Sequence, residues 1–220
     1  MAEVLITLGI VGVVAALTIP GIISSYRKQV LETRLSKLVS SVNQAVKRSE
    51  ADNDECQYWS FGDENNHRDA EIMKQWWKKY LQNYVPYEIA AEISASENSG
   101  NGGYKVYFKN GSALRLEALT KDYARIVLYP DAKITGKFLI DVNDKAGKDY
   151  FLFVLSGAYS DNNKCVLRPP VYIDMTNDML KDACLKSYNG FVSTNAAGGH
   201  CAELIRRNGW KIPKDYPIKL

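Results

Sequence analysis

An uncharged run of twenty residues, Val4 to Ile23, constrains this chain more than any other feature. Twenty helical residues at about 1.5 Å each extend about 30 Å, which is the thickness of the hydrocarbon core of a bilayer. Glu3 lies at the start of the run and is the only ionisable side chain before Arg27. Because a carboxylate at the edge of such a segment is costly, Glu3 is expected to have a function and a partner of opposite charge.

Other interpretations of residues 1–23 are weaker. A secretory signal peptide would have a positively charged N-terminal region, which Met1-Ala2-Glu3 does not supply. A helix buried in the core of a soluble protein is usually shorter than this run. A plain single-pass anchor stays open as the main alternative to a helix that also packs against its own copies.

The helix is expected to continue beyond the apolar run, because apolar side chains then recur at steps of three and four residues. These residues are Leu31, Leu35, Leu38, Val42 and Ala45. The stripe predicts packing on a globular head, since it is too short for a coiled-coil seam. Pro20 removes a helical hydrogen bond and predicts a kink. We therefore expect a stem helix over residues 1–50, with 4–23 as its membrane or filament-core part.

Residues 51–220 are long enough for one compact domain. The whole chain holds 28 basic and 25 acidic residues, a balance that gives no strong indication of a nucleic-acid partner. A helix is predicted from about residue 69 to 83. Its Trp76-Trp77-Lys78-Lys79-Tyr80 cluster resembles a nucleic-acid surface, but aromatic residues in the core with lysines in water explain it better.

Strands are predicted after this helix. Asn110-Gly111 is a strong signal for a tight hairpin turn between two of them. Residues 150–155 are apolar on both faces, which favours an inner strand with one face under the stem helix. The expected strands are 104–108, 113–119, 124–129, 136–142 and 149–155. The predicted fold class is α+β, with a long N-terminal helix packed on an antiparallel sheet.

One loop is a candidate calcium site, because calcium takes several oxygen ligands from a bend in the chain. Its candidate ligands are Asp141, Asn143, Asp144 and Asp149. The spacing does not match an EF-hand, and Asn, Asp and Gly are also ordinary turn residues. We therefore expect no cofactor, with calcium as the one candidate.

The N-terminus resembles that of type IV pilins and type II secretion pseudopilins. The similarity lies in Ala2-Glu3-Val4-Leu5-Ile6 and in Gly9-Ile10-Val11-Gly12-Val13-Val14-Ala15-Ala16. The segment 208–217 is similar to the tails of uncharacterised pilin-like proteins. In that family a glutamate near the mature N-terminus is thought to pair with the terminal amine of a neighbouring subunit, and Glu3 matches it. The resemblance implies a structural subunit of a type IV pilus or a type II secretion pseudopilus.

The chain departs from the family pattern at its start. The basic leader, its cleavage glycine and a Phe-Thr-Leu before Ala2 are not in the sequence, so processing and methylation cannot be assigned to a residue. The positive-inside rule, applied to Arg27, Lys28, Arg34 and Lys37, would place the head in the cytoplasm. The resemblance implies the opposite orientation, in which a leader carries the positive charge.

Four cysteines form no CxxC pair, so zinc spacing is poor. An even count in an exported domain favours two disulfides, for which three connectivities exist; free cysteines in a reducing compartment are the alternative. The resemblance implies a C-terminal disulfide between Cys184 and Cys201, which leaves Cys56 and Cys165 as the second pair.

The sequence contains no nucleophile elbow, HExxH, Walker or dinucleotide motif, and His200 beside Cys201 is expected to be structural. We therefore expect a protein that is not an enzyme. The resemblance implies a single pass of the bacterial inner membrane, an extracytoplasmic head and later a filament of its own copies and related subunits. Its further partners would be a prepilin peptidase and the assembly machinery. The alternatives are a membrane-anchored binding module for DNA or a surface ligand, which does not polymerise, and an anchored enzyme.

Overall fold

The structure is a computed structural model of the chain. It describes residues 2–59, 61, 69–87, 89–93, 103–120, 123–132, 145–156, 165–171, 174–188 and 198–220. The elements follow the order α1 (Ala2–Asn53), η1 (Cys56–Tyr58), α2 (Ala70–Tyr80), β1 (Ile89–Ile93), β2 (Gly103–Tyr107), β3 (Ala113–Leu119), β4 (Ala124–Tyr129), β5 (Phe151–Ser156), β6 (Val166–Arg168), α3 (Asn177–Tyr188) and α4 (Gly199–Arg207).

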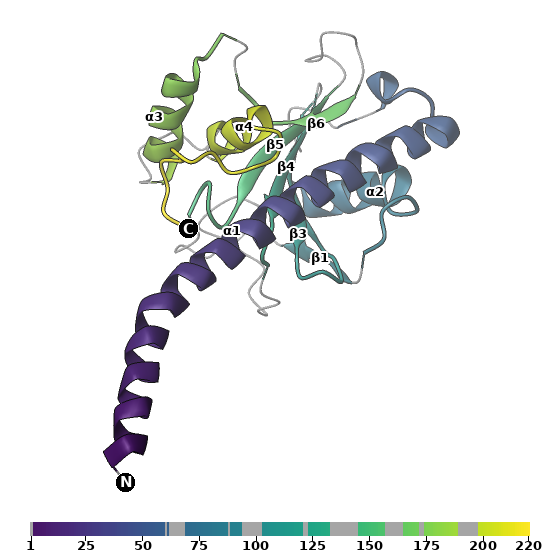
Figure 1. The fold of residues 1–220 in the computed structure, drawn as a ribbon. Helices are drawn as coiled ribbons and strands as arrows, with labels where there is room; N and C mark the ends of the chain where they lie inside the picture. Colours follow the sequence, from purple (N-terminus) through teal and green to yellow (C-terminus); the bar gives the residue numbers. More distant parts are fainter. Residues whose placement is uncertain are drawn as a thin grey trace.

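The first helix, α1, is one continuous element of 52 residues with Pro20 inside it. Figure 1 shows that its N-terminal part projects away from the rest of the molecule, that the helix curves along this part, and that its second part lies across the sheet. It ends at Asn53, three residues beyond the expected boundary, and Asp54 follows with a positive φ of 60°. We call α1 the stem, residues 2–30 its exposed half and residues 31–53 its packed half.

Within the described residues, six strands form one sheet in the order β1-β2-β3-β4-β5-β6, and each neighbouring pair is antiparallel. The predicted hairpin turn joins β2 to β3. Gly111 has a φ of 79°, which is the left-handed conformation that this turn requires. The Asn110 side chain accepts hydrogen bonds from the backbone N–H and the hydroxyl of Ser112 at 3.1 and 2.6 Å.

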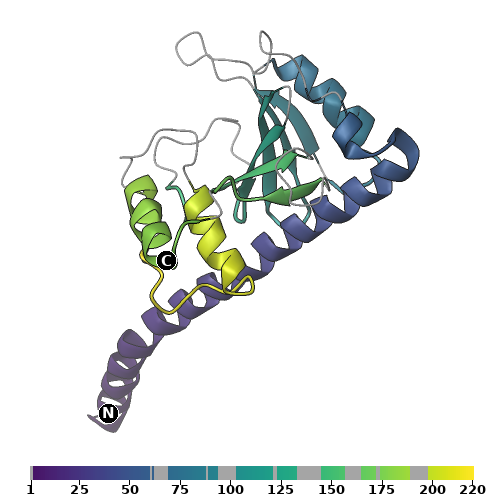
Figure 2. The same cartoon turned by 90° about the horizontal axis from the view of Figure 1, so that it is seen from above.

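One face of the sheet carries the main core. Leu114, Ile126 and Phe153 belong to the same buried cluster as Leu35 and Val42 of the stem. The stem contacts β4 and β6, α2 contacts β1, β2 and β3, and α4 contacts β5. Figure 2 shows α1 and α4 running along this side of the sheet. A second, smaller buried cluster that includes Tyr107, Val127 and Leu152 lies on the opposite face.

The structure confirms the α+β class and the antiparallel sheet. The helix α2 is shorter than predicted at both ends: Asp69 caps its N-terminus by accepting hydrogen bonds from the N–H groups of Glu71 and Ile72, and the helix ends at Tyr80. The strand β5 lies between β4 and β6, as its two apolar faces predicted. The predicted strand 136–142 lies outside the described residues. Five elements of the described residues were not predicted, namely η1, β1, β6, α3 and α4.

Candidate functional site on the stem helix

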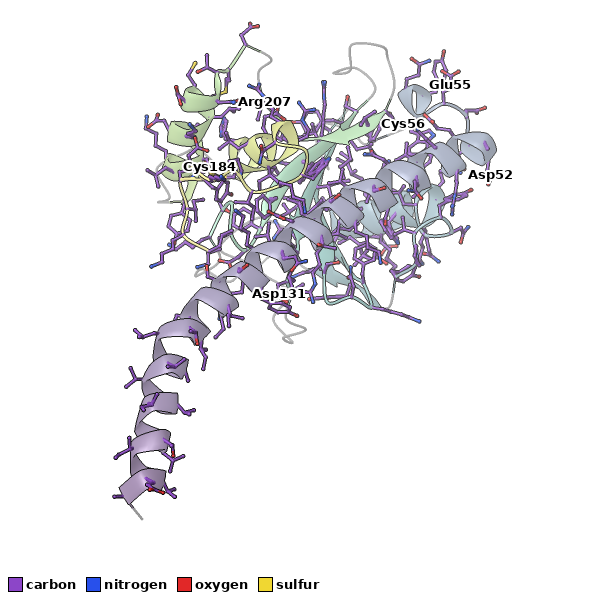
Figure 3. The ribbon with its side chains drawn as sticks, viewed as in Figure 1. Asp52, Glu55, Cys56, Asp131, Cys184 and Arg207 are labelled. Atoms are coloured by element: carbon purple, nitrogen blue, oxygen red, sulfur yellow. A yellow bond between two sulfur atoms is a disulfide. The ribbon has the colours of Figure 1, made fainter. Side chains whose placement is uncertain are left out.

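The exposed half of the stem is an apolar surface that nothing else in the described chain covers. The large apolar side chains that the structure describes between Val4 and Tyr26 range from 44% exposed (Ile23) to 77% exposed (Leu17). Figure 3 shows these side chains projecting from the helix on all sides. Among the described residues, α1 is the one helix that is long and apolar enough to cross a membrane. A surface of this kind needs lipid or another protein to remove it from water.

Glu3 lies in the first turn of the stem and is exposed. The N–H groups of a first helical turn carry partial positive charge, which stabilises a carboxylate there by a modest amount. No described residue forms a hydrogen bond or an ion pair with Glu3. Any counter-ion of opposite charge is therefore supplied from outside the described part of this chain.

Two threonines in the exposed half have their hydroxyl groups satisfied within the helix. Thr7 donates to the carbonyl of Val4 at 3.0 Å, and Thr18 donates to that of Val14 at 2.9 Å. Such back-bonding removes the cost of placing a hydroxyl in an apolar environment. A Cβ atom built on Gly9, Gly12 or Gly21 would meet nothing within 4 Å, so the chain itself gives these glycines no packing role. The exposed half is thus compatible with lipid on every side and with close approach of another helix.

The packed half is fixed to the head by buried polar contacts as well as by its apolar stripe. Glu32 is 8% exposed and accepts hydrogen bonds from the backbone N–H of Ile212 at 2.9 Å and from the Lys211 ammonium at 3.2 Å. Asn43 accepts the backbone N–H of Leu167, in the edge strand β6, at 2.7 Å. Glu32 and Asn43 are not part of the apolar stripe, and no local pattern in the sequence predicts their contacts, because their partners lie more than a hundred residues away.

A third contact lies near the point where the stem meets the head. The Arg34 guanidinium donates to the Pro130 carbonyl at 3.1 Å and to the Asp131 carboxylate at 3.0 Å. Figure 3 shows Asp131 beside α1 at this level. The Asp131 side chain is 81% exposed, so the ion pair adds little stability and serves chiefly to position the β4 end against the stem.

Both predicted disulfides are present in the structure. Cys56, just beyond the stem, bonds to Cys165, just before β6, with the Cα atoms 5.8 Å apart. Cys184 on α3 bonds to Cys201 on α4, with the Cα atoms 4.8 Å apart. The resemblance implied Cys184–Cys201, and Cys56–Cys165 was the pair that this left. The first bond attaches the far end of the stem to the edge of the sheet, next to the strand β6 that Asn43 contacts.

An open groove of about 610 Å³ separates the polar face of the packed half from the loop after α4. Its stem wall consists mainly of small polar side chains, with Lys37 among them, and its loop wall holds Trp210 and Lys211. The loop closes α4 with a Gly209 φ of 66° and a hydrogen bond from the Trp210 N–H to the Ile205 carbonyl. The charged side chains of the groove are therefore Glu32 and Lys37 on the stem wall and Lys211 on the loop wall.

The remaining sequence-predicted sites are less informative. Of the calcium candidates, Asp141, Asn143 and Asp144 lie outside the described residues, and the Asp149 carboxylate accepts the Lys145 N–H at 2.8 Å. No group of three or more potential metal ligands occurs among the residues that the structure describes.

The aromatic cluster of α2 is buried, as the core interpretation predicted. Trp76 and Trp77 are 4% and 0% exposed, while Lys78 and Lys79 are exposed. His200 is partly buried, and burial lowers its pKa below the usual value. The Trp76 and Trp77 rings are therefore not available for stacking on nucleic-acid bases.

The fold is therefore that of an α+β protein with a projecting apolar stem and a disulfide-bonded head. The chain belongs to a family of unknown function (DUF6613), whose profile matches residues 21–220. The match covers the packed half and the whole head, and it begins within the apolar run. No curated protein and no solved structure matches the chain.

Proposed function

We propose that this protein is a non-catalytic structural subunit of a type IV pilus or a type II secretion pseudopilus. The observation that supports the proposal most strongly is the exposed half of the stem, which is apolar on all sides and led by a single carboxylate. The stem first lies in the inner membrane and then joins the stems of other copies in the core of a filament. The head remains outside the membrane, where its two disulfides are stable.

Two environments suit the exposed half, and a filament subunit uses both in turn. Lipid covers the apolar side chains before assembly. Other stems cover them afterwards, and Gly9 and Gly12 then permit close contact between helices. A permanent anchor uses only the first environment and gives Glu3 no role.

Glu3 supplies the register of assembly in this proposal. A carboxylate within a bundle of apolar stems is costly unless an opposite charge reaches it, and the amino terminus of an incoming copy is such a charge. Their attraction is much stronger in an apolar core than in water, although desolvation offsets part of it. A copy that docks out of register leaves the carboxylate unpaired, so the charge pair selects one position.

The test is the substitution Glu3→Ala in the full-length chain, expressed with its assembly machinery. Removing one partner of a buried ion pair costs about 3–5 kcal/mol, so filament yield in sheared fractions should fall at least about a hundredfold. The matched control is Glu55→Ala, an exposed carboxylate just beyond the far end of the stem, which should leave the yield unchanged.

The thermal unfolding of the head should be the same in both variants, because Glu3 contacts none of its described residues. Normal filaments from Glu3→Ala would contradict the proposed mechanism. Wild-type protein that stays monomeric in the membrane in the presence of the machinery would instead favour the anchored binding module.

A further inference from the structure

Positive charge is concentrated in two segments of the chain. Residues 24–37 and 206–220 together hold nine basic and two acidic residues, whereas the rest of the chain holds nineteen basic and twenty-three acidic residues. The first segment begins one residue after the apolar run, and the second is the C-terminal tail. The small net charge of the whole chain is therefore the sum of a strongly basic part, these two segments, and a larger, slightly acidic remainder.

The fold brings the two segments together. Glu32 of the stem binds the Lys211 ammonium and the Ile212 N–H of the tail, and the same groove is lined by Lys37 and Lys211. Figures 1 and 2 both place the C-terminus beside α1, on the side of the head from which the exposed half emerges. The basic region is thus a surface next to the apolar run.

Several of these charges are already neutralised. Arg206 and Arg207 pair with the buried Glu203 at 2.7 and 2.8 Å, and Arg34 pairs with Asp131. Lys211 pairs with Glu32, although its own side chain is 68% exposed. Five basic side chains have no ion pair among the described residues, and they form the excess: Arg27, Lys28, Lys37, Lys214 and Lys219.

The basic residues begin within the depth of a lipid headgroup layer, at Arg27, and extend beyond it, to Lys37 at about 21 Å from Ile23 along the helix axis. Arg27 follows Ile23 by four residues, about 6 Å along the helix axis, and Glu32, which holds the tail, follows by about 13 Å. The headgroup region is about 5–8 Å thick on each side of a bilayer, and the field of a charged surface decays over about 8 Å at physiological salt. Tyr26, 66% exposed, is of the residue type that lies at this interface.

We propose that the basic residues of 24–37 and 206–220, here called the basic collar, bind the anionic headgroups of phospholipids in the membrane that holds the stem. This rests on the proposed function only in placing the stem in a bilayer. A basic surface also attracts nucleic acid, but lipid is favoured because the collar directly follows the membrane-length run.

The experiment uses the full-length protein in nanodiscs of phosphatidylcholine alone or with one-third phosphatidylglycerol. Hydrogen exchange of residues 206–220 reports on the collar, and exchange of residues 4–23 reports on membrane insertion. We expect tail exchange to slow at least about fivefold in the anionic discs, which is the expected contribution of one basic side chain near a charged membrane. High salt should remove the effect.

The decisive variant combines Lys211→Gln, Lys214→Gln and Lys219→Gln, which should abolish the lipid dependence of tail exchange. Its matched control combines Lys47→Gln, Arg48→Gln and Lys78→Gln, three exposed basic residues away from the apolar run, and should behave like the wild type.

If residues 4–23 are protected but residues 206–220 exchange equally fast in both kinds of disc, lipid binding by the basic collar is overturned and the proposed function is not. Tail protection by duplex DNA but not by phosphatidylglycerol would overturn it in favour of a nucleic-acid surface. Fast exchange of residues 4–23 in both discs would overturn the membrane-inserted stem, and with it the proposed function.

Discussion

The two halves of α1 are one helix in two environments. In the packed half, Leu35 and Val42 are fully buried while Lys37 and Gln44 remain in water. In the exposed half, large apolar side chains face outward on every side. A helix with one apolar stripe is satisfied by its own chain, whereas a helix that is apolar all round requires a second molecule or a membrane. The difference marks the exposed half as the apolar surface that the described part of the chain leaves uncovered.

Removal of the disulfide at the end of the packed half should have the largest effect on the stability of the head. Cys56–Cys165 closes 109 residues, so replacing both cysteines with serine should lower the free energy of unfolding of the head by about 5 kcal/mol. The matched control, Cys184–Cys201, closes 17 residues and should cost about 3 kcal/mol. Denaturant unfolding measures both values; an equal or reversed order would show that the stem end is not held as described.

The next largest effect on head stability comes from replacing one leucine with alanine in each half of the helix. Leu35→Ala should destabilise the head by about 2–5 kcal/mol, because Leu35 is fully buried and leaves a cavity. Leu17→Ala should leave head unfolding unchanged, because Leu17 is 77% exposed and contacts nothing in the head. Denaturant midpoints in a mild detergent measure both. A loss of head stability from Leu17→Ala would break the distinction between the halves.

The smallest effect is pH dependence of the head. Burial alone would raise the pKa of Glu203, but hydrogen bonds from Arg206 and Arg207 outweigh it and lower the pKa below the usual value. A carboxylate with a lowered pKa adds stability above its unfolded-state pKa, and this stability is lost as the pH falls through the folded-state value.

Head stability should therefore fall below about pH 4.5, the ordinary range of a glutamate. Glu203→Gln should remove about 1 kcal/mol at pH 7 and flatten this dependence. Urea unfolding from pH 7 to pH 3 measures it; the same acid slope in the variant and the wild type would assign the effect to other carboxylates.

Local patterns predicted the parts of the fold that depend on neighbours in sequence. The spacing of Leu31, Leu35 and Leu38 predicted the packed face, and Asn110-Gly111 predicted the β2–β3 hairpin. The strands β1 and β6 were missed because the first is rich in alanine and the second has three residues. The helix α4 could have been found, since Cys201, Leu204 and Ile205 recur on one face.

The features of the candidate site also fall into two groups, those that the sequence predicts and those that only the fold reveals. Its apolar surface and Glu3 are evident in the sequence, since both depend only on composition and order. The contacts of Glu32 with Ile212 and of Asn43 with Leu167 are not, because each joins residues more than a hundred positions apart. The basic collar was hidden for the same reason: its two segments lie at opposite ends of the chain and only the fold makes them one surface.

The attachment of the stem to the sheet has a mechanical consequence. Tension applied to the N-terminal end of α1 reaches the head along the length of the packed half, through Glu32, Asn43 and finally the Cys56–Cys165 bond. These contacts are loaded in shear and together, instead of being peeled apart one after another. Force then passes to the edge of the sheet through a covalent bond, and the globular part can be pulled as a rigid body.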